Sequence, residues 1–157
     1  MIYFVGAGSG AIDLITVKGK DLLERADLII YAGSLVNPGL LEYAKNECVI
    51  MDSASMTLEE VIDAMVPATE AGKLVVRLHT GDPSVYGAHR EQMDILRKKG
   101  LDFEVVPGVS SFCAAAAALK AEYTLPNVSQ SVIITRMEGR TPVPDRQRIA
   151  DYAAHGA

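Results

Sequence analysis

Short apolar runs alternate with longer amphipathic segments along most of this chain. The runs are compact and rich in β-branched residues, and they predict strands at Ile2–Val5, Leu28–Tyr31, Val49–Met51, Leu74–Leu78 and Phe103–Val106. The segments between them have the spacing of helices that bury one face. Strands that alternate with helices pair in parallel, so the sequence predicts an α/β fold with a mostly parallel five-stranded sheet flanked by helices.

The clearest predicted helix begins at Thr57. Thr57 and Glu60 have the spacing of a capping box, and apolar residues recur along one face after them. Pro67 is expected to kink or end this helix. A second helix is expected to begin within residues 84–87, and a third is expected over residues 110–119.

The sequence predicts a domain boundary after the third helix. Residues 1–120 form the first domain, residues 121–128 a linker, and residues 129–157 the incomplete start of a second α/β domain. The last segment offers one strand, Ser131–Thr135, and one helix from Asp145. These elements are too few for an independent sheet domain.

Composition narrows the classes of partner. The 157-residue chain has a net charge of -5, which disfavours nucleic acid. Its apolar runs fall short of the roughly 20 residues of a membrane span, and Met1 leads directly into a strand without a leader pattern. The expected location is cytoplasmic. The spacing typical of metal ligands is absent from the two cysteines, Cys48 and Cys113, and from the histidines. No metal site is therefore predicted.

The first strand leads into a glycine-rich loop, Gly6-Ala7-Gly8-Ser9-Gly10-Ala11, which formally fits a dinucleotide fingerprint. A dinucleotide site also needs a helix that starts on the loop and an acidic residue after the second strand. Residues 12–16 intervene before the helix, and the only nearby acid, Asp27, precedes the second strand. A nicotinamide site is therefore the less favoured alternative, and a tight turn without a ligand also stays open.

Two further loops follow predicted strands. In Thr80-Gly81-Asp82-Pro83, the proline keeps Asp82 out of the helical region, so its carboxylate either faces a ligand or caps the next helix. In Pro107-Gly108-Val109-Ser110-Ser111, free backbone N–H groups and two hydroxyls lie at a helix start. Ser110 taken alone is more often a helix cap than a ligand contact. Ligands bind where strands of open α/β sheets end, so the two loops predict a pocket.

A charged loop follows the predicted boundary and contains Arg136, Glu138 and Arg140. A solvated loop is the default interpretation. Guanidinium groups bind carboxylates in a bidentate manner, so these arginines become candidate ligands if the substrate carries many carboxylates.

Taken in order, the glycine-rich loop, the G-D-P loop, the P-G-V-S-S turn and the segment after residue 128 resemble the tetrapyrrole methylase family. Within it, Tyr31–Val36, Arg77–Gly87 and Thr135–Pro144 resemble the branch that methylates carbon 11 of precorrin-4 or cobalt-precorrin-4 in cobalamin biosynthesis. The resemblance implies S-adenosyl-L-methionine as methyl donor, S-adenosyl-L-homocysteine as product, and a homodimer. It leaves open whether the tetrapyrrole contains cobalt.

The resemblance also implies roles for particular residues. Cofactor contacts fall on Thr80, Gly81, Asp82, Val85, Tyr86, Ser110 and Ser111. Substrate contacts fall on Gly6, Gly8, Ser9, Gly10, Arg136, Glu138 and Arg140. Methyl transfer is an in-line displacement that needs positioning rather than a protein nucleophile. Asp82 is the first candidate for a general base and Glu138 the second. The alternatives are an inactive fragment or binding remnant of such an enzyme, or a nicotinamide oxidoreductase.

Overall fold

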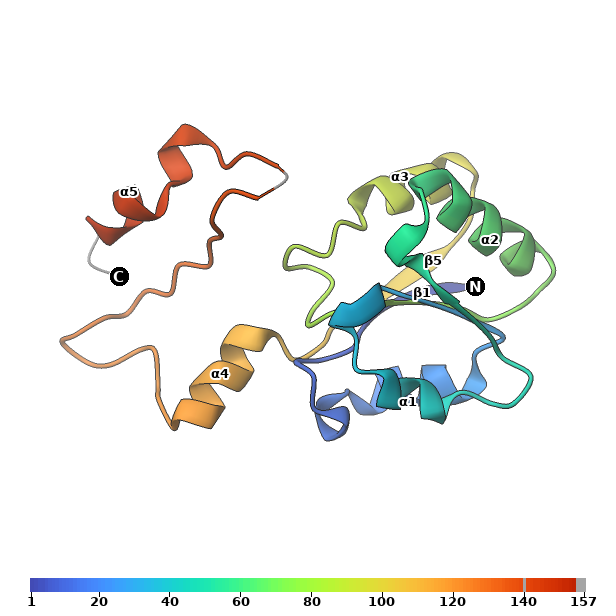
Figure 1. Ribbon diagram of the computed structural model, residues 1–157, viewed down its shortest axis with the longest axis horizontal. Helices are drawn as coiled ribbons and strands as arrows, with labels where there is room; N and C mark the ends of the chain where they lie inside the picture. Colours follow the sequence, from blue (N-terminus) through green and yellow to red (C-terminus); the bar gives the residue numbers. More distant parts are fainter. Residues whose placement is uncertain (140, 155–157) are drawn as a thin grey trace. The chain divides into compact units, whose positions relative to one another are not determined.

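The computed structural model describes residues 1–139 and 141–154. Its centre is a five-stranded sheet in the order β3-β2-β4-β1-β5, and every strand pairing is parallel (Figure 1). The strands are β1 (Ile2–Gly6), β2 (Leu28–Tyr31), β3 (Val49–Asp52), β4 (Val75–His79) and β5 (Phe103–Val106). The predicted α/β fold with five parallel strands is confirmed.

Helices cover both faces of the sheet. The α-helices are α1 (Val17–Arg25), α2 (Leu58–Glu70), α3 (Arg90–Lys98), α4 (Ser111–Leu119) and α5 (Ile149–Ala153). α1 lies against one face, and α2 and α3 lie against the other (Figure 1). Neighbouring strand residues point to opposite faces. Val76 therefore packs with Leu23 of α1, whereas Val75 packs with Met65 of α2 and Leu96 of α3.

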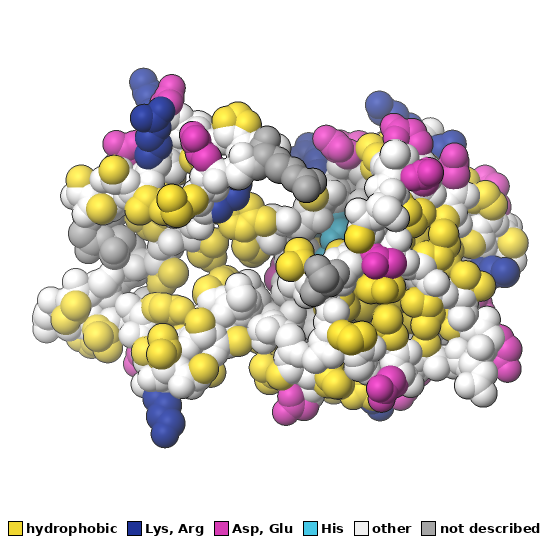
Figure 2. All heavy atoms as spheres, viewed as in Figure 1, with side chains coloured by type: hydrophobic (Ala, Val, Ile, Leu, Met, Phe, Trp, Pro, Cys, Tyr) yellow, Lys and Arg dark blue, Asp and Glu magenta, His cyan; other side chains and the backbone are white. Residues whose placement is uncertain are grey.

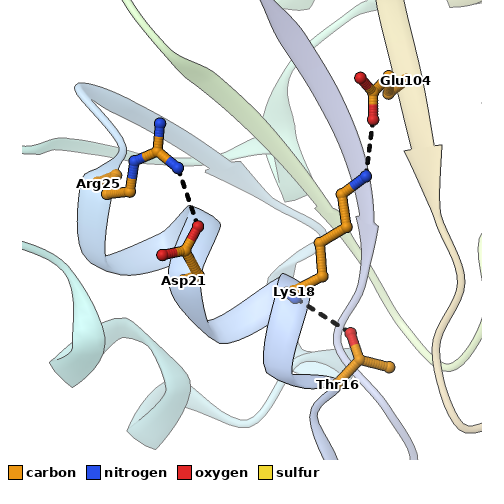
Figure 3. Close-up of polar contacts among 6 residues, drawn as sticks. Thr16, Lys18, Asp21, Arg25 and Glu104 are labelled. Carbon is orange, nitrogen blue, oxygen red and sulfur yellow. Dashed lines mark hydrogen bonds and ion pairs between the residues drawn. The ribbon is translucent and has the colours of Figure 1, made fainter.

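α1 is capped at its start and linked to the edge of the sheet. The Thr16 side chain accepts a hydrogen bond from the Gly19 backbone N–H at 3.1 Å. In the same turn, Lys18 forms an ion pair with Glu104 of β5 at 2.8 Å (Figure 3). A cap of this kind satisfies a backbone donor that the first turn of a helix leaves without a partner.

α2 confirms the predicted capping box. The Glu60 N–H donates to Thr57 Oγ1 at 3.2 Å, and the Thr57 N–H donates to Glu60 Oε2 at 2.7 Å. Pro67 does not end this helix, which continues to Glu70.

α3 begins later than the sequence predicts. Its first residue is Arg90, not a residue within 84–87. Tyr86 and Ala88 have φ angles of 54° and 49°. These angles belong to the left-handed region, where a right-handed helix cannot continue, so the predicted start was wrong.

The chain divides into two compact units, Met1–Ala114 and Ala115–Ala157. This division falls inside α4, whereas the sequence predicts a linker over 121–128. The strand predicted at Ser131–Thr135 is not formed, and that prediction was wrong. A strand needs a neighbour to pair with, and the described residues of the second unit contain no strand. The helix predicted from Asp145 is a 3₁₀ turn, Asp145–Gln147, followed by α5.

No helix among residues 1–139 and 141–154 has the length and apolar character needed to span a membrane.

Candidate functional site

The strand order brings three loops to one edge of the sheet. β1 lies between β4 and β5, with Gly6 opposite His79 and Val5 opposite Val106. The strands are parallel, so the loops that follow them all leave from the same edge. The glycine-rich loop, the G-D-P loop and the P-G-V-S-S turn therefore meet, at the edge where ligands bind in open α/β sheets.

Glycines let these loops touch through their backbones. A Cβ atom on Gly6 would lie 2.6 Å from both the Gly108 Cα and the Gly81 carbonyl oxygen, too close for any side chain. Gly8 and Gly81 form an antiparallel bridge. The Asn37 side-chain amide donates to the Gly10 carbonyl oxygen at 2.6 Å. The glycine-rich loop is thus fixed against the G-D-P loop on one side and the segment after β2 on the other.

A pocket of about 360 Å³ opens among these loops. This volume is in the usual range for a small-molecule site. The pocket brings together residues from all three predicted loops: Ser9, Thr80, Gly81, Asp82, Val85, Tyr86, Ser110 and Ser111. Four other lining residues, Ala32, Leu35, His79 and Gly87, were not predicted.

His79 is the chemically notable residue that sequence reasoning missed. It is 4% exposed and lies at the end of β4. Burial lowers the pKa of His79 to about 3, and the nearby charges of Arg77 and His89 act in the same direction. Its Nε2 atom is buried without a hydrogen-bond partner in the described part of the chain. A histidine that ends a buried strand just before a ligand loop is the signal that could have found it.

Asp82 uses both carboxylate oxygens within the site. Oδ1 accepts from the Ser84 N–H at 2.8 Å, and Oδ2 accepts from the Gly108 N–H at 2.9 Å. Burial alone would raise the pKa of Asp82, but the hydrogen bonds from Gly108 and Ser84 outweigh it and lower the pKa below 3.8. Asp82 does not cap α3, because that helix begins only at Arg90.

Ser110 lies at the start of α4 and at the pocket. Its carbonyl oxygen accepts from the N–H groups of Cys113 and Ala114 at 3.1 and 3.2 Å, which places Ser110 at the N-cap position of α4. The residue is 9% exposed and also lines the pocket.

Two apolar side chains of the pocket are open to solvent. Leu35 is 71% exposed and Tyr86 is 58% exposed. Figure 2 shows hydrophobic side chains at the surface of the unit formed by residues 1–114. Exposed apolar groups beside a cavity are typical of ligand contact.

The charged loop belongs to the second unit. Arg136 and Glu138 line a different pocket of about 460 Å³ there. The Arg136 guanidinium donates to the carbonyl oxygens of Met137, Thr141 and Pro142 and to the Thr141 hydroxyl, at 2.9 to 3.2 Å. These bonds order its own loop. Arg140 lies outside the described residues, and a substrate role for this loop stays a prediction.

The described residues show no candidate metal site. Residues 1–139 and 141–154 contain no group of three or more His, Cys, Asp and Glu side chains that could hold a metal ion.

Two curated proteins are similar in sequence to this chain over nearly its whole length. The chain is 61% identical over 154 residues to a cobalt-precorrin-4 C(11)-methyltransferase of Methanocaldococcus jannaschii, covering 98% of this chain and 60% of that protein. It is 45% identical to a precorrin-4 C(11)-methyltransferase of a Sinorhizobium species, covering 99% and 62%. The chain therefore spans 60% to 62% of the length of these curated relatives.

Two solved structures are also similar to this chain. The structure of a cobalt precorrin-4 methyltransferase matches with a TM-score of 0.92 and 49% identity, covering 98% of this chain and 64% of that one. A uroporphyrin-III C-methyl transferase from Thermus thermophilus in complex with S-adenyl homocysteine matches with a TM-score of 0.68 and 32% identity, covering 83% and 52%. The family model of the tetrapyrrole (corrin/porphyrin) methylases matches residues 1–157. The chain belongs to the tetrapyrrole methylase family.

Proposed function

We propose that this chain binds S-adenosyl-L-methionine in the pocket between the three loops and acts in the methylation of precorrin-4 or cobalt-precorrin-4 at C11. The observation that carries this proposal is the convergence of Thr80, Asp82, Tyr86, Ser110 and Ser111 on one pocket. The resemblance of their motifs alone implies a cofactor contact for each. The names and the identity of the relatives support the substrate.

The charge of the pocket suits this cofactor. S-adenosyl-L-methionine supplies an electrophilic methyl group on a positively charged sulfonium. Asp82 is ionised at neutral pH because its pKa is lowered, and His79 is neutral because burial lowers its pKa to about 3. The pocket therefore presents a negative charge to a cation and no positive charge from its histidine. The remaining task of the protein is to hold the reacting carbons in line and exclude water.

The substrate side of the proposal rests on the resemblance. Gly6, Gly8, Ser9 and Gly10 are proposed to face the macrocycle, with Arg136, Glu138 and Arg140 near its carboxylates. The sequence offers Asp82 and Glu138 as bases for a proton lost from the ring, and the two backbone hydrogen bonds that Asp82 accepts weigh against it in that role.

A pair of charge variants tests the cofactor site. Leu35→Arg places a cation on an exposed pocket residue, so we expect it to weaken binding of S-adenosyl-L-methionine, a cation, more than binding of S-adenosyl-L-homocysteine. The matched control is Val49→Arg, at a residue of β3 that is 52% exposed and outside the pocket.

Calorimetric titration reads out both effects. Micromolar binding of S-adenosyl-L-homocysteine, about -8 kcal/mol, with no binding of NAD, supports the proposal. Binding of NAD alone contradicts it and supports the oxidoreductase alternative. Equal effects of the two arginine variants contradict the assigned pocket.

Turnover with each tetrapyrrole tests the reaction. Methylation of precorrin-4 or cobalt-precorrin-4 supports the C11 assignment and identifies the preferred substrate. Cofactor binding without methylation supports the alternative of a binding remnant. A cytoplasmic homodimer is the proposed setting, and sedimentation of the purified chain checks the dimer.

A further inference from the structure

Asp82 joins two loops that are distant in the sequence. Its Oδ1 accepts a hydrogen bond from the N–H of Ser84 in its own loop. Its Oδ2 accepts one from the N–H of Gly108 in the turn after β5. Bonds from a backbone N–H to a carboxylate are stronger than bonds between neutral groups. One side chain therefore connects the loop after β4 to the turn after β5.

The neighbouring residues explain why this link matters. Gly6, Gly81 and Gly108 meet backbone against backbone and contribute no side chains that could hold these segments together. The Asp82 carboxylate supplies a directional contact at this junction. The two segments that it joins also carry the pocket residues Gly81 and Ser110.

The same bonds make Asp82 a poor proton acceptor. Both carboxylate oxygens already accept backbone N–H groups at 2.8 and 2.9 Å. A general base works best when its pKa lies near the working pH. Burial opposes ionisation of Asp82, yet the bonds from Gly108 and Ser84 prevail and lower its pKa, which weakens it as a base.

We propose that Asp82 is a positioning residue that fixes the Gly81 and Ser110 walls of the pocket to each other, rather than the base of the reaction. This inference rests on the proposed function, because the walls in question are those of the proposed cofactor site. The link itself exists without ligand and is measurable without one.

The first test uses the unliganded wild-type chain and NMR. The amide protons of Ser84 and Gly108 should both shift as Asp82 titrates, with one shared midpoint below 3.8. His89 is the other titrating group with which Asp82 interacts. Asp82→Asn should abolish the shared midpoint and leave the His89 transition, which distinguishes the two groups. Amide shifts of Ser84 and Gly108 that do not follow one carboxylate overturn the proposal.

The second test is hydrogen exchange in Asp82→Asn. The asparagine side chain has only one acceptor oxygen. Its NH₂ group cannot accept a hydrogen bond from the second backbone N–H. We therefore expect exchange at Ser84 or Gly108 to accelerate about 10-fold or more while the amides of β1 and β4 stay protected. The matched control is Asp52→Asn, since Asp52 accepts from the Ala54 N–H in a similar turn outside this pocket. Unchanged protection at both Ser84 and Gly108 overturns the proposal.

The third test separates positioning from proton transfer. A positioning role predicts that Asp82→Asn weakens binding of S-adenosyl-L-homocysteine about 10-fold or more, whereas Asp52→Asn binds as wild type. Unchanged affinity with loss of turnover would overturn the inference and favour a base. If the wild-type chain binds no S-adenosyl-L-homocysteine, the proposed function fails, and the two NMR tests still decide whether the link exists.

Discussion

Gly8 and Gly81 hold each other through two backbone hydrogen bonds: the Gly8 N–H donates to the Gly81 carbonyl oxygen at 3.2 Å, and the Gly81 N–H donates to the Gly8 carbonyl oxygen at 2.8 Å. A dinucleotide fingerprint needs such glycines for the close approach of backbone to a pyrophosphate. Here the N–H group of Gly8 is directed at a neighbouring loop instead. The glycine-rich loop thus forms part of the pocket wall.

A methyl group on Gly8 should disturb this pairing. Gly8 has a φ of 77°, and a Cβ atom there would lie 3.1 Å from the Leu14 carbonyl oxygen. We expect Gly8→Ala to lower the free energy of unfolding by about 1–2 kcal/mol in urea titrations and to weaken binding of S-adenosyl-L-homocysteine. Gly72→Ala is the control, because Gly72 has a φ of 78° and a Cβ atom there would meet nothing within 4 Å. Equal affinity losses in both variants would argue against a role of Gly8 in the pocket.

Tyr86 and Ala88 offer a test in which stability and binding change in opposite directions. Left-handed backbone at a residue other than glycine costs about 1–3 kcal/mol, and glycine's extra chain entropy offsets about 0.5–1 kcal/mol of the relief. We therefore expect Ala88→Gly to raise the free energy of unfolding by up to about 2 kcal/mol, and Tyr86→Gly by less, because it also removes the contacts of the Tyr86 side chain. Only Tyr86→Gly removes a side chain from the pocket, so only this variant should bind S-adenosyl-L-homocysteine more weakly. Wild-type affinity in Tyr86→Gly would show that the ring does not contact the ligand.

His79 makes stability depend on pH. The unfolded histidine has its ordinary pKa of 6.5, whereas burial first, and then Arg77 and His89, lower the native pKa to about 3. Between these two values the unfolded chain binds a proton that the native chain does not, so the free energy of unfolding falls as the pH decreases from 6.5 towards about 3. His79→Gln should reduce this slope in urea titrations at about pH 7 and about pH 5. The wild type and His79→Gln both retain His89. An unchanged slope would therefore show that a group other than His79 causes the pH dependence of stability.

The first turn of α1 allows the contribution of a helix cap to stability to be compared with that of a surface ion pair. Thr16 caps the helix through the Gly19 N–H, so Thr16→Ala should destabilise the chain by about 1 kcal/mol. The Lys18 and Glu104 side chains are 58% and 46% exposed, so Lys18→Ala should destabilise the chain less than Thr16→Ala, and salt should reduce its effect further. Thermal or urea unfolding measures both. A larger effect for Lys18→Ala would mean that the ion pair is more than a screened surface contact.

Much of the first unit could be predicted because its signals are local. β2 and β5 begin and end where the apolar runs at Leu28–Tyr31 and Phe103–Val106 do, and the capping box at Thr57 fixes the start of α2. Strands buried in a parallel sheet are continuous apolar runs, which makes them visible in one sequence. The convergence of the strand-end loops on one pocket followed from the same reasoning.

The rest depended on tertiary structure. The start of α3 is set by left-handed backbone at Tyr86 and Ala88, and no side-chain pattern there indicates it. The run Ser131–Thr135 has strand composition, but the described part of its unit offers no partner strand. His79 directly follows the predicted strand Leu74–Leu78, but only the folded structure shows that its side chain is buried beside the pocket.

The contact of Gly6, Gly81 and Gly108 limits how this pocket can be re-engineered. Any larger residue at Gly6 or Gly108 would push a strand end away from its neighbour before it changed the shape of the cavity. Libraries aimed at new cofactor analogues should therefore keep these glycines and vary Leu35 and Tyr86, which are exposed and can change size without moving the sheet.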